Sequence, residues 1–159
     1  MATTTKQNLV IPDTLRWTPM PAPYAESMST LLPVTMKPDF PAPCRRCLQD
    51  SNPGDEMVLV SYDPFVGNSP YRCASPIFLH TKPCELASPR VLPEQQRSRL
   101  LSVRAYDANH MMRGNEVVPG DKVLETCERL LAEDGPGEYC HVHNAAAGCF
   151  AVRVDKAQK

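Results

Sequence analysis

His141-Val-His143-Asn144-Ala-Ala-Ala-Gly148-Cys149-Phe150 is the stretch that decides the fold, because it predicts two strands joined by a short loop. The residues on both sides of the loop alternate between apolar and polar, as in strands with one buried face. We expect strands over residues 139–143 and 149–154, and a hairpin loop over residues 144–148.

Pairing across this loop brings three residues of the first strand opposite three of the second: His143 opposite Cys149, His141 opposite Ala151, and Tyr139 opposite Arg153. We expect Val142, Phe150 and Val152 to face the core. The two imidazoles, the thiol and the guanidinium then share the other, solvated face. That face has room for chemistry, although the residues alone do not name a reaction.

The remaining pattern predicts an α+β domain. Strands are expected over residues 57–62, 76–80 and 100–106, and a helical turn over 93–98. One main helix, over about 121–133, is expected to pack on one face of a mostly antiparallel sheet. Its apolar stripe consists of Val123, Leu124, Cys127, Leu130 and Leu131.

The first 43 residues differ from the rest of the chain. Eight of the seventeen prolines lie before Cys44, so regular helix or central strand is disfavoured there, apart from a short helix over residues 25–32. Large apolar residues, among them Trp17 and Phe40, are unusual in a free tail. We therefore expect residues 1–43 to form a proline-rich arm packed on a single α+β domain of residues 44–159.

Charge and composition exclude several partners. Seventeen basic and eighteen acidic residues give a net charge of −1, which offers no support for nucleic-acid binding. No apolar stretch approaches the roughly 20 residues that a membrane crossing needs. The N-terminus lacks the pattern of a secretory signal, so we expect a cytoplasmic protein whose seven cysteines are free thiols. The oligomeric state is open.

Cys44-Arg-Arg-Cys47 leaves three functional interpretations open. A redox pair usually opens a helix after a strand, but turn-forming residues follow here. A structural zinc site would need a second pair, and there is no second Cys-x-x-Cys, although His141 and His143 could complete a mixed site. Cys44 could also act as a thiol nucleophile, its pKa lowered by the neighbouring arginines. Plain packing of both cysteines in a loop is the structural alternative.

The other strands extend the polar face. If Ser102, Arg104 and Tyr106 share a sheet face with the histidine hairpin, guanidinium groups join the imidazoles and the thiol. Guanidinium matches carboxylate or phosphate bidentately, so the face suits an anionic ligand. A solvated face without function is the alternative, because antiparallel sheets commonly wet one side. His80 is expected at the surface, and Cys73 and Cys84 show no partner pattern.

Several segments together resemble the uncharacterised family catalogued as domain of unknown function 1203. They are Pro43-Cys-Arg-Arg-Cys-Leu48, Val60-Ser-Tyr-Asp-Pro-Phe65, Pro70-Tyr-Arg72, Pro76-Ile-Phe-Leu-His80, Val103-Arg-Ala-Tyr-Asp107, Tyr139-Cys-His-Val-His-Asn-Ala145 and Gly148-Cys-Phe150. The resemblance runs from about Pro41 to Asp155 and implies no established activity or cofactor. In the family pattern the position of Cys44 and the histidine hairpin are shared. The position of Cys47 can be serine, and that of His80 is not always histidine.

We expect a small enzyme without a cofactor that acts on a carbonyl- or carboxylate-bearing small molecule, by lyase, cyclase or isomerase, or hydrolase chemistry. Cys44 or Cys149 supplies the thiol, and His143 is the general base, oriented by His141 or Asn144. The residues expected to bind the substrate are Arg72, Arg104, Tyr106, Asn144 and Arg153.

Two alternatives remain at this point. A metal-dependent enzyme would use zinc or iron bound by His141, His143 and Cys44, because His-x-His on a strand directs both rings to one side. A non-catalytic domain that binds a small molecule or a partner comes third. Metal analysis of the purified protein separates the first two possibilities, and we expect no bound metal.

Overall fold

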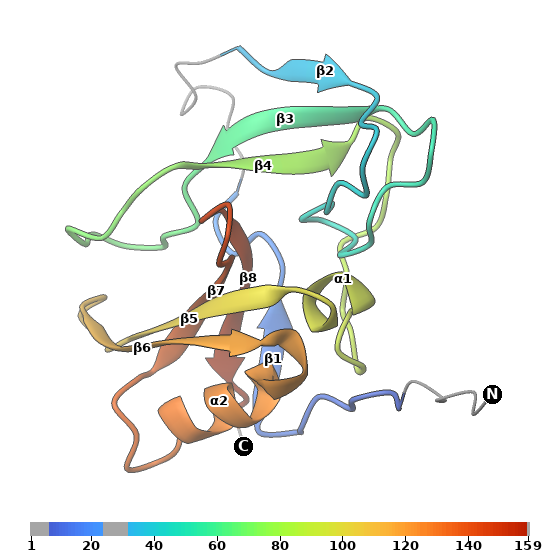
Figure 1. Cartoon of the computed structure of the whole chain (residues 1–159). Helices are drawn as coiled ribbons and strands as arrows, with labels where there is room; N and C mark the ends of the chain where they lie inside the picture. Colours follow the sequence, from blue (N-terminus) through green and yellow to red (C-terminus); the bar gives the residue numbers. More distant parts are fainter. Residues whose placement is uncertain (1–6, 24–31, 159) are drawn as a thin grey trace.

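Two antiparallel sheets make up the fold of the computed structural model, which describes residues 7–23 and 32–158. The five-stranded sheet has the order β1 (Leu15–Thr18), β8 (Phe150–Lys156), β7 (Tyr139–Asn144), β5 (Leu100–Tyr106), β6 (Met112–Pro119). The three-stranded sheet has the order β2 (Val34–Met36), β3 (Met57–Tyr62), β4 (Ser75–His80). The helices are short: α1 (Glu94–Arg97), the 3-10 turn Gly120–Lys122, and α2 (Val123–Leu130). Figure 1 shows the smaller sheet at the top and α2 at the bottom, on opposite sides of the larger sheet. The α+β class is confirmed.

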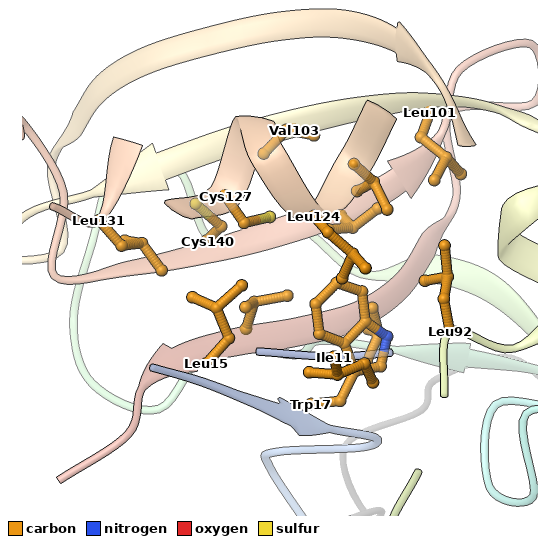
Figure 2. Close-up of a cluster of buried hydrophobic side chains, with 14 of the residues drawn as sticks. Ile11, Leu15, Trp17, Leu92, Leu101, Val103, Leu124, Cys127, Leu131 and Cys140 are labelled. Carbon is orange, nitrogen blue, oxygen red and sulfur yellow. The ribbon is translucent and has the colours of Figure 1, made fainter. Parts of the chain in front are cut away.

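The larger core lies between α2 and the five-stranded sheet. The expected stripe of α2 is buried against alternate residues of β5, β7 and β8, including Val103, Cys140 and Val152. Cys127 and Cys140 face each other within this core (Figure 2), and both are fully buried. Trp17 of β1 closes one side, and its indole N–H donates to Gln96 Oε1 at 2.7 Å. The apolar periods of the sequence correctly predict the buried stripe of α2 and the core-facing residues of β5 and β7.

Helix α2 ends earlier than expected, at Leu130 rather than near residue 133. The backbone N–H of Gly137 donates to the carbonyl of Leu130 at 3.0 Å. A Cβ at Gly135 would lie 2.7 Å from the same carbonyl oxygen, so only glycine lets the chain fold back this closely. The chain therefore reverses directly after the helix. Strand β6, which follows β5, was not expected, because its polar residues and Pro119 give it no strand signature.

The histidine hairpin forms, but its expected register is wrong. His143 pairs with Phe150, His141 with Arg153, and Tyr139 with Asp155. A β-bulge lies next to Val142 and His143, and Ala151 is the extra residue on β8. Alternation along the sequence could not reveal it, because the residues from Cys149 to Val152 are all apolar.

Because of the bulge, Phe150 and Val152 face opposite sides of the sheet, although residues two apart in a regular strand share a face. Val152 and Val154 belong to the core under α2, whereas Phe150 packs with Tyr62 and Ile77 of the other sheet. The expectation that Phe150 shares a face with Val152 is therefore wrong. Because the bulge redirects Phe150, one large side chain of β8 reaches the second core.

The polar face of the five-stranded sheet is buried, not solvated as expected. His141 is fully buried and His143 is 8% exposed. Phe65, which follows β3, packs with Tyr106 and Tyr139 over this face. The smaller sheet and its connections therefore cover the side that the sequence left open to solvent.

The described parts of the proline-rich arm supply two strands. Strand β1 pairs with β8, and β2 pairs with β3. Trp17 is buried, while Leu32 and Phe40 are exposed. The helix expected over 25–32 lies almost entirely outside the described residues. Within residues 7–23 and 32–158, no helix is long and apolar enough to span a membrane.

Candidate functional site

The sheet brings the expected polar residues together across β5 and β7. Ser102 pairs with His143, Arg104 with His141, and Tyr106 with Tyr139. Directly paired residues project from the same face, so the shared polar face is confirmed. Burial changes its chemistry, because groups removed from water favour their neutral forms.

His141 sits inside a box of aromatic rings. The ring centroids of Phe65, Tyr106, Tyr139 and Phe150 lie 4.7 to 5.3 Å from that of His141. Burial lowers the pKa of His141 to about 2. Neither ring nitrogen has a hydrogen-bond partner among the described residues. The side chain is therefore a neutral ring among aromatic rings, and the cluster of possible metal ligands around Cys44 does not include it.

His143 is held by its own hairpin loop. Its Nδ1 lies 2.9 Å from the carbonyl oxygen of Gly148. A carbonyl oxygen can only accept a hydrogen bond, so in the neutral ring Nδ1 carries the proton and Nε2 is unprotonated. Burial lowers the pKa of His143 to about 4, although the Gly148 hydrogen bond acts in the opposite direction. His143 thus fixes the residue that precedes Cys149.

The thiol of Cys149 contacts an arginine that the sequence analysis placed beside Cys44. Arg45 Nη2 donates to Cys149 Sγ at 3.0 Å. The same guanidinium donates from Nε to the Phe150 carbonyl at 2.7 Å and from Nη1 to the Pro43 carbonyl at 2.6 Å. Asn144 Nδ2 lies 3.6 Å from the sulfur. The hairpin loop and the Cys44–Cys47 segment therefore meet at Cys149.

An apolar pocket of about 550 Å³ opens above this contact. Cys149, Arg45 and Asn144 contribute its polar lining, together with Arg99, which is paired with Asp50. Its other lining residues are Phe40, Pro41, Pro43, Leu59, Pro76, Phe78, Leu100, Ala146 and Ala147. A pocket with apolar walls and a few convergent polar groups is the usual form of a small-molecule site.

The arginines expected to bind substrate have other partners. Arg72 pairs with Asp63 at 2.9 Å. Arg153 pairs with Asp155 at 2.7 Å and lies over the Tyr139 ring, 3.9 Å from its centroid. An anionic ligand would have to displace these contacts. None of the residues lining the pocket above Cys149 is one of these arginines.

Arg104 and Tyr106 also lie away from this pocket. Arg104 Nε donates to the Ser102 hydroxyl at 3.3 Å. Burial raises the pKa of Tyr106 to about 12, so its hydroxyl stays protonated. Tyr106 stacks on Tyr139 with ring centroids 5.4 Å apart. Both residues therefore belong to the packed face around His141.

Cys44 lies in a second cluster, with Cys47, His80 and Cys84, whose ligand atoms are all within 4.8 Å of one another. Burial raises the pKa of the Cys44 thiol, but backbone N–H groups of Cys47, His80 and Arg46 outweigh it and lower the pKa to about 7. Burial raises the pKa of Cys47 to about 12. His80 and Cys84 were not expected as ligands, although the x₃ spacing between them is a metal-ligand pattern in its own right.

Comparison with known proteins gives a family and no relative of known activity. No curated protein matches the chain, and no solved structure matches it. The profile of one family, described as "Protein of unknown function (DUF1203)", matches residues 41–156. This range includes the cluster of Cys44, Cys47, His80 and Cys84, the pocket residues Arg45 and Cys149, and the histidine hairpin. The chain therefore belongs to the DUF1203 family.

Proposed function

We propose that the protein is a small-molecule enzyme in which the Cys149 thiolate attacks a carbonyl group of a largely apolar substrate. The contact of Arg45 Nη2 with Cys149 Sγ, 3.0 Å long and at the pocket wall, carries this proposal. The pocket has room for a small molecule, and its polar groups converge on one sulfur.

The charge of Arg45 supports the thiolate. Arg45 is 1% exposed, and its guanidinium stays protonated in proteins. Burial lowers the pKa of Arg45, and the Cys149 sulfur acts against that effect. Among the described residues no carboxylate pairs with Arg45; its partners are two carbonyls and the sulfur. A buried cation needs a counter-charge, and a thiolate at Cys149 supplies it.

The pocket walls select the substrate class. Phe40, Leu59 and Phe78 contribute apolar surface, which favours a substrate with an aliphatic or aromatic body. Phe40 and Pro41 come from the proline-rich arm. In this proposal the end of the arm, from Phe40 to Pro43, packs on the domain and forms one wall of the pocket.

The chemical step begins with addition of sulfur to the carbonyl carbon. A carbon–sulfur bond forms while the C=O π pair moves to oxygen, and the Arg45 guanidinium and the Asn144 amide, both beside the sulfur, would donate to that oxyanion. Collapse of the adduct expels the leaving group, which takes a proton from solvent, and leaves a thioester. Water then adds to the thioester carbonyl, the carbon–sulfur bond breaks, and the products are the carboxylate, a proton released to solvent and the regenerated Cys149 thiolate. His143 holds Gly148 and so positions Cys149, instead of acting as the general base.

Covalent labelling tests the proposal. The full chain is incubated with small aldehyde, activated-ester and enone probes that have apolar or charged bodies, and adducts are located by mass spectrometry. We expect adducts of the apolar probes at Cys149, none there in Cys149→Ser, and unchanged labelling of Cys149 in Cys73→Ser. Arg45→Gln should slow labelling about tenfold or more, since a hydrogen bond to a charged group is worth about 1.5–3 kcal/mol.

A second variant guards against misfolding of Arg45→Gln. Ala147 is exposed and lines the pocket, so Ala147→Phe should leave the melting temperature unchanged and block the apolar probes. Adducts confined to exposed Cys73, or labelling of Cys149 that neither Arg45→Gln nor Ala147→Phe slows, would overturn the proposal. Turnover of ester probes by Cys149→Ser would also overturn it.

A further inference from the structure

Four soft ligands from two separate segments meet on the side of the smaller sheet. Cys44 and Cys47 flank a tight turn, His80 ends β4, and Cys84 follows it by four residues. Their ligand atoms lie within 4.8 Å of one another. Cys44 is fully buried, while the other three are half-buried and line a surface groove. The cluster is thus closed on one side and accessible to ions on the other.

Two separations within the cluster match the edges of a tetrahedron around one ion, and all of the ligand atoms lie within 4.8 Å of one another. Zinc–sulfur bonds of about 2.3 Å and zinc–nitrogen bonds of about 2.0–2.1 Å imply S···S edges of about 3.8 Å and S···N edges of about 3.6 Å. Cys44 Sγ lies 3.8 Å from Cys84 Sγ. Cys47 Sγ lies 3.5 Å from His80 Nδ1. Two edges of the cluster therefore already have the lengths that one zinc ion requires.

The second nitrogen of His80 has the partner that a metal ligand usually has. His80 Nε2 lies 3.6 Å from Asp55 Oδ2, while Nδ1 faces the sulfurs. Metal-bound histidine commonly directs its other N–H to a carboxylate or carbonyl, which fixes the ring and its tautomer. Asp55 thus supports ligation through Nδ1.

The turn that carries two of the cysteines is built to direct them. The N–H of Leu48 donates to the Cys44 carbonyl at 3.1 Å, and the N–H of Cys44 donates to the Gln49 carbonyl at 3.1 Å. Leu48 adopts a left-handed φ of 57°, an uncommon conformation for leucine. These two hydrogen bonds hold the turn in the strained conformation. In this turn the sulfurs of Cys44 and Cys47 lie on one side, within the same cluster.

We propose that Cys44, Cys47, His80 and Cys84 bind one Zn²⁺ in a tetrahedral Cys₃His site that stabilises the fold. Three thiolates and an imidazole favour zinc, and four protein ligands leave no open position for catalysis. Three thiolates around Zn²⁺ leave about one net negative charge. The positive charge of Arg46 favours the thiolate form of Cys84 and partly balances that charge. The inference departs from the expected metal-free state, which rested on the missing second Cys-x-x-Cys and on serine at the position of Cys47 in the family pattern. In this chain Cys47 is present, and His80-x₃-Cys84 takes the place of the missing pair.

The bound metal would join the turn to the end of β4. The chain already links them through the N–H of Arg45, which donates to the Phe78 carbonyl at 3.0 Å. Arg45 lies between two of the ligands, so the metal would also hold the segment that brings its guanidinium to Cys149. This last consequence rests on the proposed function, whereas metal binding itself does not.

Elemental analysis of the full chain, purified without chelator under reducing conditions, tests the site. We expect about one equivalent of zinc per chain, lost in Cys84→Ser and in His80→Ala. Cys73→Ser is the matched control, because Cys73 is exposed and outside the cluster. Both Cys73→Ser and Cys149→Ser should keep the zinc, so failure of the proposed function at Cys149 would be seen separately.

Cobalt gives a readout that does not depend on variants that fold. Wild-type protein stripped of zinc should bind Co²⁺ with the intense visible bands of tetrahedral thiolate coordination, and Zn²⁺ should abolish them. Chelation should lower the melting temperature of the wild type and leave that of Cys84→Ser unchanged. Absence of metal together with absence of the cobalt bands would overturn the inference. So would a Cys44–Cys84 disulfide in the freshly purified protein, iron or copper instead of zinc, or zinc retained by both ligand variants.

Discussion

The two faces of the five-stranded sheet are both buried, but by different means. One face carries aliphatic residues such as Val103 and Val142 and is covered by α2. The other carries Tyr106, Tyr139, His141 and Phe150 and is covered by Phe65, which follows β3 of the smaller sheet. Helix α2 lies between β6 and β7 in the chain, so the first face is closed by a neighbouring segment. The second face is closed by chain from the smaller sheet, far away in sequence.

Burial has opposite consequences on the two faces. Removing aliphatic groups from water stabilises the fold by about 25 cal/mol per Å². Removing imidazoles from water disfavours their charged form, which is why the pKa values of His141 and His143 fall to about 2 and about 4. The second face therefore contributes stability that depends on pH, whereas the first does not. The reactive group of the proposed function, Cys149, lies at the edge of this face, where it meets Arg45.

The largest effect is expected for Phe150→Ala, which removes the side chain that the bulge sends into the second core. Phe150 is fully buried and contacts the rings of Tyr62, His141 and His143. Loss of a buried phenylalanine costs about 3–5 kcal/mol in the free energy of unfolding, to be measured by urea denaturation. Phe40→Ala is the matched control, because Phe40 is 48% exposed and its loss should cost less than about 1 kcal/mol. Equal losses in the two variants would show that the second core does not need Phe150.

Sequence patterns predicted the face that α2 covers. Strand β5 and helix α2 each have an apolar period that fits their geometry, so Leu101, Val103 and Cys127 were placed correctly. The alternation also placed Arg104 and His141 on one face, as their pairing confirms. The alternation could not predict whether that face is exposed to solvent, because the residues that cover it belong to the smaller sheet and its connections. It also missed the bulge at Ala151, which a run of apolar residues conceals.

The candidate sites were predicted only in part. Cys149 and Asn144 were named because the hairpin is local, and the structure brings them together. Arg45 was overlooked as a partner of Cys149, since 104 residues separate the two. His80 and Cys84 were set aside because only a second Cys-x-x-Cys was considered as the partner of Cys44 and Cys47, although His80-x₃-Cys84 has a ligand spacing of its own. Long-range contacts, rather than local patterns, decide both sites.

Lowering the pH should destabilise the protein through the second face alone. In the unfolded chain both histidines have a pKa of about 6.5, so they become protonated below that pH. In the folded protein their pKa values are about 2 and about 4, so His141 and His143 stay neutral over the same range. Stability is therefore complete above pH 6.5 and falls as the pH decreases toward about 4. Between pH 6.5 and 5 each histidine should cost about 2 kcal/mol in the free energy of unfolding. Urea titrations at several pH values measure it, and a flat profile over this range would show that water reaches both rings.

The smallest expected effect, and the sharpest contrast between the faces, comes from His141→Leu. Leucine has a similar volume and removes two ring nitrogens that have no hydrogen-bond partner among the described residues. Since an unsatisfied buried polar group costs about 1–3 kcal/mol, the loss of ring contacts should be offset, leaving stability at pH 7.5 within about 1 kcal/mol of wild type. At pH 5 the variant should exceed the wild type by about 2 kcal/mol, because only His143 still titrates. A variant that loses stability equally at both pH values would mean that the aromatic box needs the imidazole itself. In that case the second face would be held together by ring contacts that an aliphatic side chain cannot replace, and its difference from the α2 face would lie in packing rather than in protonation.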